Sequence, residues 1–341
     1  MNKIKKTDHF YLIDGSGYIF RAYYALPPLT RKSDGLPTGA VSGFCSMLFK
    51  LLEDSKSKEN KQKPTHFAVI FDSARKTFRN DIYKEYKANR SEAPEDLIPQ
   101  FEYIRKSVKA FNLPSIELLN YEADDLIATY AKQITDAGAK VTVISSDKDL
   151  MQLVSTNVRL YDPMKSKVLG EKEVIEKFGV KPNQVIDVQS LAGDSSDNIP
   201  GVDKIGPKTA ISLLDKYSDL ESIINNIDNI KGKISDNLAK SLDSIEIAKK
   251  LIKLKSDVDI DTNIKNYIIS SKDEKSLAND VVNYLSENNF KCTHAPKLSK
   301  ARDLIKRNNY DTVLLDLGLP DGDGLSLISI IKSNDITCGV I

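Results

Sequence analysis

The stretch Lys140-Val-Thr-Val-Ile144-Ser-Ser-Asp147-Lys148-Asp149 decides the fold, because a short apolar run ends there in acidic residues. Two other runs end in the same way: Phe10 to Ile13 leads into Asp14, and His66 to Phe71 leads into Asp72. Short apolar runs of this kind are typical of buried parallel strands. The sequence therefore predicts a sheet whose strands each carry an acidic residue at the carboxyl end.

Helical patterns at Thr38 to Leu52 and at Ala123 to Ile134 separate these runs. Strands alternating with helices predict an α/β fold with a parallel sheet. The pattern changes near residue 180, because Pro182 to Asp257 shows only helical segments. Alternation resumes near residue 262, with strands expected at Tyr267 to Ile269 and Thr312 to Leu315 and a helix at Lys297 to Asn308. We expect three domains, at residues 1–180, 181–262 and 263–341.

Composition narrows the class of protein. The 341 residues hold 49 Lys and Arg against 48 Asp and Glu, and this balance excludes a uniformly basic surface for nucleic acid. A hydrophobic content of 40% predicts a globular chain. The three widely spaced cysteines predict no disulfide framework. The apolar run behind the basic N-terminus is too short for a signal peptide or a membrane span, so we expect a cytoplasmic protein without a membrane partner.

Two further acidic groups join the three at the strand ends. Glu122, Asp124 and Asp125 open a helical pattern, and Asp194 and Asp197 open the helical region. Each group alone is ordinary turn or capping chemistry. Ligands of parallel sheets bind beyond the carboxyl ends of the strands, so we expect the groups to meet there. The full set of nine carboxylates is Asp14, Asp72, Glu122, Asp124, Asp125, Asp147, Asp149, Asp194 and Asp197.

Carboxylates gathered in this way repel one another unless cations neutralise them or their pKa values rise. Oxygen ligands without His or Cys select hard divalent ions such as Mg²⁺ or Mn²⁺. Two such ions suit in-line displacement at phosphorus, because the attacking and the leaving oxygen both need charge stabilisation. The acidic set therefore predicts metal-assisted hydrolysis of phosphodiesters.

Two other stretches point to nucleic acid. The segment Arg75 to Arg90 holds six Lys and Arg against two acids, with Phe78, Tyr83 and Tyr86 interleaved. This pattern indicates either single-strand binding or a solvated helix with a tyrosine stripe on the core, and both stay open. Gly201 to Ala210 predicts two helices joined by a Gly-x-x-x-x-Gly turn. Its backbone N–H groups can hold a duplex phosphate, although an ordinary helix-helix turn has the same pattern.

These motifs together resemble the 5′-nuclease family, which includes flap endonucleases and the 5′-nuclease domain of bacterial DNA polymerase I, over about residues 8 to 262. Among them are Tyr86-Lys-Ala-Asn-Arg90 and Gly193-Asp-Ser-Ser-Asp197-Asn-Ile-Pro-Gly201. Asn120 stands where that family usually has Gly. The resemblance implies a PIN-like core followed by a helix-hairpin-helix region.

The resemblance also implies roles for particular residues. The nine carboxylates would bind or surround two Mg²⁺ ions, with Mn²⁺ as a substitute. Arg79, Lys87 and Arg90 would lie in a helical arch and make the catalytic contacts to the scissile phosphate. The hairpin residues Gly201, Ile205, Gly206, Lys208 and Thr209 would grip duplex DNA, together with a K⁺ ion.

The implied activity is a structure-specific 5′→3′ exonuclease and flap endonuclease of replication and repair. Its substrates would be DNA with a 5′ flap, a nick or an RNA primer. About 80 residues follow residue 262, too few for a polymerase module, so we expect a monomeric nuclease without polymerase activity that works beside a separate polymerase. A junction-binding module without catalysis, regulated by the last 80 residues, is the alternative. The complete acidic set, with Lys87 and Arg90, argues against it, because a site that only binds DNA has no use for uncompensated anions.

The last 80 residues resemble part of a response-regulator receiver domain, a flavodoxin-like α/β fold. Tyr310 to Leu325 matches its phosphoacceptor strand and loop, which makes Asp316 the implied phosphorylated residue. The acidic pair that normally follows the first strand falls ambiguously near Asp273 and Glu274, and the chain stops inside the fourth strand. A truncated, degenerate receiver or a fusion of two unrelated fragments is therefore favoured over a phosphorylation-controlled signalling protein.

Overall fold

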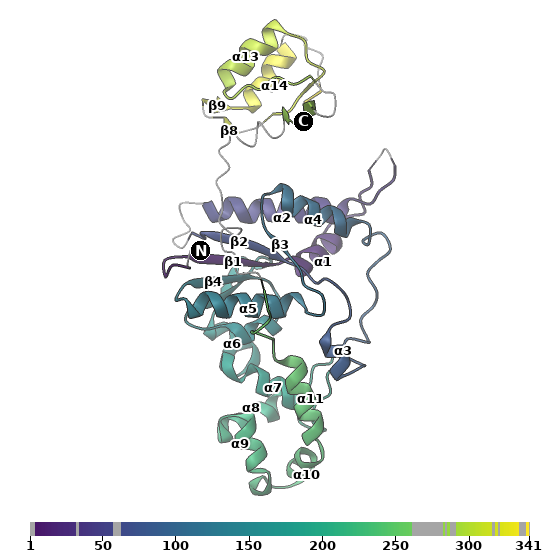
Figure 1. The fold of residues 1–341 in the computed structure, drawn as a ribbon, viewed down its shortest axis with the longest axis vertical. Coiled ribbons are helices and arrows are strands. Elements are labelled where there is room, and N and C mark those ends of the chain that lie inside the picture. Colours follow the sequence, from purple (N-terminus) through teal and green to yellow (C-terminus); the bar gives the residue numbers. More distant parts are fainter. Residues whose placement is uncertain are drawn as a thin grey trace. The chain divides into compact units, whose positions relative to one another are not determined.

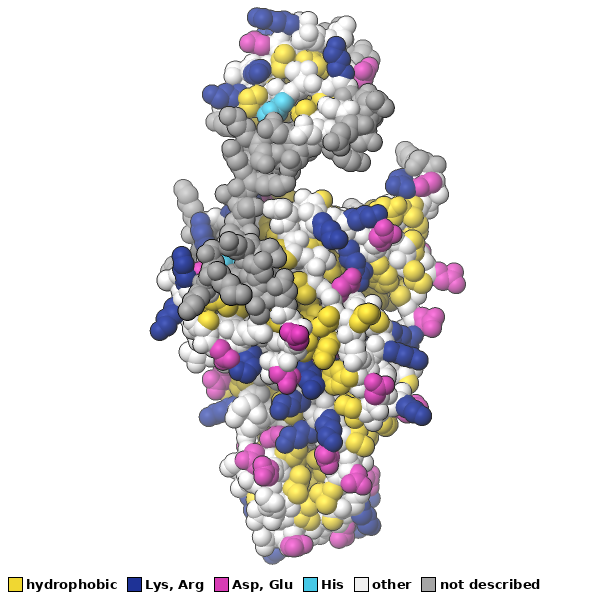
Figure 2. Space-filling model, in the orientation of Figure 1, with side chains coloured by type: hydrophobic (Ala, Val, Ile, Leu, Met, Phe, Trp, Pro, Cys, Tyr) yellow, Lys and Arg dark blue, Asp and Glu magenta, His cyan; other side chains and the backbone are white. Residues whose placement is uncertain are grey.

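A computed structural model describes residues 4–31, 34–56, 63–260, 282–283, 285–286, 291–315, 318–319, 321–333 and 339–340. The chain divides into two compact units, Met1–Ile269 and Ser270–Ile341, which are considered separately. In the described part of the chain, no helix combines the length and apolarity that crossing a membrane requires. Lys and Arg side chains alternate with Asp and Glu over the visible face of the first unit (Figure 2), as expected from the balanced charge.

The first unit is built on a six-stranded sheet with the order β3-β2-β1-β4-β5-β6. Its strands are β1 (His9–Asp14), β2 (His66–Ile70), β3 (Ser115–Ile116), β4 (Lys140–Ile144), β5 (Val158–Asp162) and β6 (Lys167–Leu169). Strands β1 to β5 pair in parallel, and only β6 is antiparallel to its neighbour. The predicted parallel α/β sheet is confirmed, including its three apolar strands.

Helices cover both faces of this sheet (Figure 1). Side chains alternate along β1, so that Tyr11 and Ile13 join one core and Phe10 and Leu12 join the other. The first core contains α1 (Gly15–Ala25), α2 (Gly39–Lys56) and α4 (Gln100–Ala110), and the second contains α5 (Ala123–Asp136) and α6 (Glu171–Phe178). The short helix α3 (Phe78–Ile82) and the 3-10 helix η1 (Asp149–Leu153) border the carboxyl edge of the sheet.

Only helices follow β6 and α6 in the first unit, within the described residues up to 260. They are η2 (Pro182–Gln184), α7 (Val185–Ala192), α8 (Pro207–Tyr217), α9 (Leu220–Asn225), η3 (Ile227–Asn229), α10 (Lys233–Lys240) and α11 (Leu242–Ile252). Gly193 ends α7 with a positive φ of 74°, and a Cβ there would lie 2.5 Å from the backbone nitrogen of Gly201. Glycine is therefore required where the chain passes closely over itself.

The second unit contains α13 (Leu298–Arg307) and α14 (Leu325–Ser333), with β7 (Thr312–Val313), β8 (Gly318–Leu319), β9 (Gly322–Asp323) and β10 (Gly339–Val340). The predicted helix at 297–308 is confirmed, and the predicted strand at 312–315 is present as the shorter β7. Strands β7 and β10 pair in parallel. Asp316, the acidic pair Asp273 and Glu274, and the strand expected at 267–269 lie outside the described residues.

Candidate active site

A pocket of about 170 Å³ lies at the carboxyl ends of the central strands. Eight of the nine predicted carboxylates line it: Asp14, Asp72, Glu122, Asp124, Asp147, Asp149, Asp194 and Asp197. The cations in its wall are Arg79, Lys87 and Arg90. The expected convergence at the sheet edge is therefore observed, and the wall carries more negative than positive groups.

Hydrogen bonds from backbone N–H groups hold the three acidic residues at the strand ends. Asp14 ends β1 and caps α1 by accepting a hydrogen bond from the Gly17 N–H group (2.8 Å). Asp72 follows β2 and accepts from the Ala123 N–H group (2.7 Å), which connects the strand end to the start of α5. Asp147 follows β4 and accepts from the Asp149 N–H group (2.8 Å). The same side chains that cap and turn the chain thus face one pocket.

The remaining carboxylates come from the start of α5 (Glu122 at its N-cap and Asp124), from η1 (Asp149) and from the acidic loop (residues 194–199). This loop is closed by an isolated bridge between Asp194 and Ile199, whose backbones exchange two hydrogen bonds. Asn120, just before α5, has a φ of 73°, in the left-handed region that Gly and Asn adopt most readily. This conformation explains why Asn can stand where the resembled family usually has Gly.

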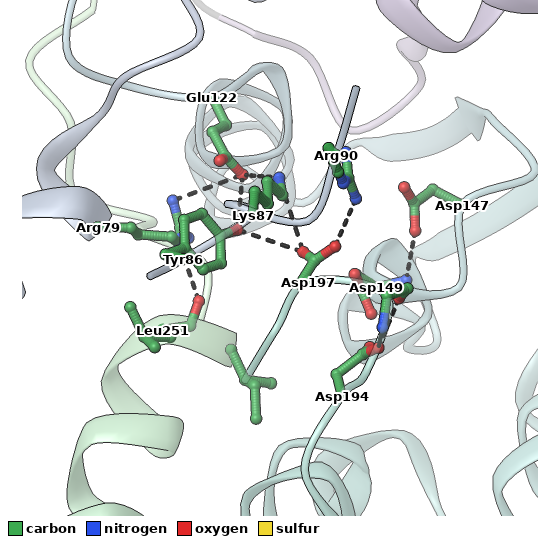
Figure 3. Close-up of polar contacts among 12 residues, drawn as sticks. Arg79, Tyr86, Lys87, Arg90, Glu122, Asp147, Asp149, Asp194, Asp197 and Leu251 are labelled. Carbon is green, nitrogen blue, oxygen red and sulfur yellow. Dashed lines mark hydrogen bonds and ion pairs between the residues drawn. The ribbon is translucent and has the colours of Figure 1, made fainter. Parts of the chain in front are cut away.

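Three of the pocket carboxylates are paired with cations (Figure 3). Lys87 donates to Glu122 (2.9 Å) and lies 3.7 Å from Asp197, which also pairs with Arg90. Although burial opposes the charge of Lys87, Glu122 and Asp197 raise its pKa. Asp194 pairs with Lys148, and this contact helps hold the pKa of Asp194 below its usual range despite burial.

The other five, Asp14, Asp72, Asp124, Asp147 and Asp149, form no ion pair with a described Lys or Arg. Burial raises the pKa of Asp14, and the charges of Asp72 and Asp147 add to the rise. Burial also raises the pKa of Asp124, again with Asp147 contributing. Burial and Asp147 raise the pKa of Asp149 to about 6. These five side chains form an under-neutralised anionic group.

The donor chemistry of this group fits hard divalent ions, because all its ligand atoms are carboxylate oxygens and their repulsion is relieved by positive charge. The group is not yet a coordination sphere. Among the residues that the structure describes, no three His, Cys, Asp or Glu side chains are arranged to hold one ion. The group therefore fits a divalent ion by the identity and charge of its donor atoms, and not by a preformed coordination geometry.

Two residues considered for contacts to nucleic acid are buried. Arg79 is only 1% exposed, and its guanidinium donates to both oxygens of Asp125 (2.6 and 2.8 Å), so its charge is already paired inside the protein. Tyr86 is 4% exposed, and its hydroxyl donates to Glu122 (3.2 Å) and Asp197 (3.3 Å), so its ring cannot stack on a base. For this tyrosine the core interpretation is the correct one.

The expected helical arch also differs from the structure. Only α3 is helical within the basic segment (residues 75–90), and Lys87 and Arg90 lie in the turns that follow. Lys87 has a positive φ of 54°, which its N–H group stabilises by donating to the Asp197 carbonyl (2.9 Å). The Asn89 amide donates to the Ser195 carbonyl (2.9 Å). The basic segment therefore packs against the acidic loop.

The predicted hairpin lies between α7 and α8, and none of its five residues lines the pocket. Gly206 caps α8, Pro207 begins that helix, and Lys208 is exposed in its first turn. Ile205 differs from the expectation, because its side chain is 2% exposed and packs in the core. Only its backbone is left for a contact with DNA.

The sequence did not single out Lys148 or Gln189. Lys148 bridges Asp194 and Ser196, and the Gln189 amide donates to Asp149 (2.9 Å). Lys148 stands between Asp147 and Asp149, and Gln189 lies four residues before Gly193, one helical turn away. These positions beside predicted site residues were the sequence features that could have identified the two side chains, since neighbours along the chain share the same surroundings.

Most of the chain is similar to one family of known proteins. Residues 9–179 match the family described as 5′-3′ exonuclease, N-terminal resolvase-like domain, and residues 180–275 match its C-terminal SAM fold. Residues 268–341 match the response regulator receiver domain. A 5′-3′ exonuclease of Aquifex aeolicus is 41% identical, with 78% of this chain and 89% of the relative covered.

A DNA polymerase I of Rhizobium leguminosarum is 52% identical over 81% of this chain, and the chain spans 27% of that relative's length. A zinc-bound 5′-exonuclease of bacteriophage T5 has a TM-score of 0.60 at 24% identity, covering 73% of this chain and 90% of that one. A T5 flap endonuclease in complex with DNA and metal ions has a TM-score of 0.59 at 21% identity, covering 83% and 100%. At these identities the structural likeness concerns the fold.

The parallel sheet and the helical region that follows it correspond to the two matched domains of a 5′-3′ exonuclease. The chain belongs to the 5′-3′ exonuclease family.

Proposed function

We propose that this chain is a structure-specific 5′→3′ nuclease that hydrolyses phosphodiesters near the 5′ ends of flapped or nicked DNA and of RNA primers. The observation that carries this proposal is the pocket lined by eight carboxylates and three cations. A site built only to bind DNA has no use for uncompensated anions facing phosphates, whereas a hydrolytic site uses them to hold metal ions.

Asp14, Asp72, Asp124, Asp147 and Asp149 would hold Mg²⁺, because they have no cation partner among the described residues. Glu122, Asp194 and Asp197 would complete a two-ion site. Bound ions would supply the positive charge that activates water and stabilises the charge developing on the phosphate. Mn²⁺ would substitute, since it accepts the same oxygen ligands.

The cationic side chains at the pocket would contact the phosphates of the substrate. Lys87 and Arg90 border the pocket from the turns of the basic segment, where they can donate to a phosphate as readily as to Glu122 and Asp197. The backbone at Gly201 and at the start of α8 would hold duplex phosphates, with Lys208 and Thr209 beside it and K⁺ as an accessory ion.

The proposal extends to domain organisation, oligomeric state, cellular location and partner. We expect domains at residues 1–180, 181–262 and 263–341, a monomer acting in the cytoplasm, and a separate polymerase as partner. The homology to DNA polymerase I supports a link to that enzyme class.

The test uses a 5′-labelled flap duplex with and without Mg²⁺. We expect metal-dependent release of short 5′ products, and we expect Asp147→Ala to abolish cleavage while flap binding is retained. Asp215→Asn, at an exposed position on α8, is the matched control and should cleave normally. Flap binding by the wild type without cleavage across a Mg²⁺ and Mn²⁺ titration would replace the proposal with the junction-binding module.

The match to the receiver family supports a second candidate function, phosphorylation at Asp316. Acetyl phosphate is the reagent to use. Labelling of the wild type but not of Asp316→Asn would support it, and an unlabelled wild type would exclude it.

A further inference from the structure

Asp125 differs from the other eight predicted carboxylates, because it does not line the pocket and is 0% exposed. Its oxygens accept four hydrogen bonds. Two come from Arg79 (2.6 and 2.8 Å), one from the Lys255 N–H group (2.8 Å) and one from the Glu122 N–H group (3.2 Å). A carboxylate offers about four acceptor positions, so no lone pair is left for a metal ion.

Arg79 uses its remaining donors at the end of α11. Its Nε atom donates to the Leu251 carbonyl (2.8 Å), and Nη2 lies 3.4 Å from the Lys253 carbonyl (Figure 3 shows the first contact). These carbonyls belong to a strap (residues 251–258) that leaves the helical region and returns to the sheet domain. Arg79 and Asp125 therefore join α3, α5 and this strap at one buried point.

Neutral side chains hold the same strap. The Gln152 amide donates to the Ile252 carbonyl (3.1 Å) and accepts from the Leu254 N–H group (3.1 Å). The Thr129 hydroxyl donates to the Lys255 carbonyl (3.2 Å). Because Leu251, Ile252 and Leu254 also line the pocket, a shift of the strap changes the pocket wall.

The strap continues from α11, which contacts the elements next to the acidic loop and the basic segment. Helix α11 packs against α7, which leads into the acidic loop, and against α3, which begins the basic segment. Tyr86, Ile199 and Leu251 form one buried cluster that combines the basic segment, the acidic loop and α11. A shift of α11 would therefore move both the acidic loop and the basic segment.

We propose that Arg79 and Asp125 are positioning residues for the nuclease site rather than a phosphate contact and a metal ligand. By seating the strap, they hold the acidic loop and the basic segment at the correct distance from the carboxylates of the sheet. This inference rests on the proposed nuclease function for its kinetic consequence, but its structural part is independent of activity.

Hydrogen exchange and Mn²⁺ binding test the structural part. In Asp125→Asn and Arg79→Lys we expect faster amide exchange in the strap, with a smaller loss of Mn²⁺ affinity, measured with Mn²⁺ alone, than in Asp147→Asn. In the matched variant Asp147→Asn we expect the reverse, with unchanged strap exchange and a loss of Mn²⁺ binding. Equal loss of Mn²⁺ binding in Asp125→Asn and Asp147→Asn would overturn the proposal, as would unchanged strap exchange in Asp125→Asn.

Kinetics test the positioning role. Misplacement by about 1 Å can slow a reaction by about a hundredfold, so we expect kcat of Arg79→Lys and Asp125→Asn to fall at least tenfold with little change in KM. Gln152→Ala removes strap contacts without burying an unpaired charge, so it keeps the test valid if the charged variants do not fold; its kcat should fall in the same direction. Full activity in Gln152→Ala and Arg79→Lys would overturn the role. A wild type that cleaves nothing would instead refute the proposed function and leave the exchange result standing.

Discussion

Replacing Asp149 with asparagine measures how much stability the metal-free chain loses to its acidic pocket. Asparagine has the same shape and can keep the hydrogen bond from the Gln189 amide (2.9 Å). Burial raises the pKa of Asp149 from 3.8 to about 6, with Asp147 adding to the rise. Since one pKa unit corresponds to about 1.36 kcal/mol, ionised Asp149 costs the folded state about 3 kcal/mol. Partial solvent access lowers this to about 1 to 3 kcal/mol.

The sign of the pH dependence follows from proton linkage. Asp149 binds its proton more tightly in the folded chain than in the unfolded chain, so the wild type loses stability as pH rises from 3.8 to about 6. Above that range the loss is constant. Below about pH 4 the side chain is neutral in both states, and the difference between Asp149→Asn and wild type approaches zero.

Thermal unfolding in EDTA at about pH 7.5 and at about pH 4 is the assay. At the higher pH, Asp149→Asn should melt roughly 2 to 12 °C above wild type, since about 1 kcal/mol shifts the midpoint of a domain of this size by about 2 to 4 °C. If Asp149 holds metal as proposed, excess Mg²⁺ should reverse the order, because ions that bind only the folded state stabilise it and the variant lacks that carboxylate. Asp215→Asn is the exposed control and should change little under any condition. An Asp149→Asn protein that melts below wild type in EDTA at the higher pH would refute the reasoning.

Three other predictions concern the hairpin, the basic segment and the second unit. A Cβ at Gly201 would lie 2.3 Å from the Ala192 carbonyl oxygen, so Gly201→Ala should lower the free energy of unfolding by more than about 2 kcal/mol in denaturant titration. Lys87→Met removes the cation closest to Glu122 and should slow single-turnover cleavage at least about tenfold, whereas Lys84→Met, at an exposed position of the same segment, should not. A chain ending at residue 261 should cleave at the wild-type rate, because every residue that lines the pocket comes before that point.

The pocket was predictable from the sequence because its first members depend on local order along the chain. An acidic residue directly after an apolar run stands at the carboxyl end of a strand, and parallel pairing brings such ends together. Asp14 ends β1, and Asp72 and Asp147 follow β2 and β4 within three residues. Their meeting point required no knowledge of side-chain contacts.

The roles of the cations were not predictable in this way. Arg79 stands in a basic stretch with interleaved aromatic residues, which is the pattern of a nucleic-acid surface. Its burial depends on the Leu251 carbonyl, 172 residues away in sequence, and on Asp125, 46 residues away. Lys148 likewise pairs with Asp194 across 46 residues. Partners at such separations are decided by tertiary packing, and no local pattern reports them.

The division of the carboxylates into paired and unpaired groups connects stability with activity. Glu122, Asp194 and Asp197 are paired with the chain's own lysines and arginines, so part of their negative charge is offset in the absence of metal. Three members of the unpaired group keep their protons more strongly than usual, since the pKa of Asp149 is about 6 and those of Asp14 and Asp124 are raised.

Metal ions must displace these protons, because carboxylates bind metals in their ionised form. Metal affinity should therefore fall steeply as pH drops below about 6, and the same repulsion that destabilises the metal-free chain at neutral pH makes the pocket receptive to divalent ions. Measuring Mn²⁺ affinity against pH examines this directly. A flat profile between about pH 5 and about pH 8 would mean that the unpaired carboxylates are not the ligands.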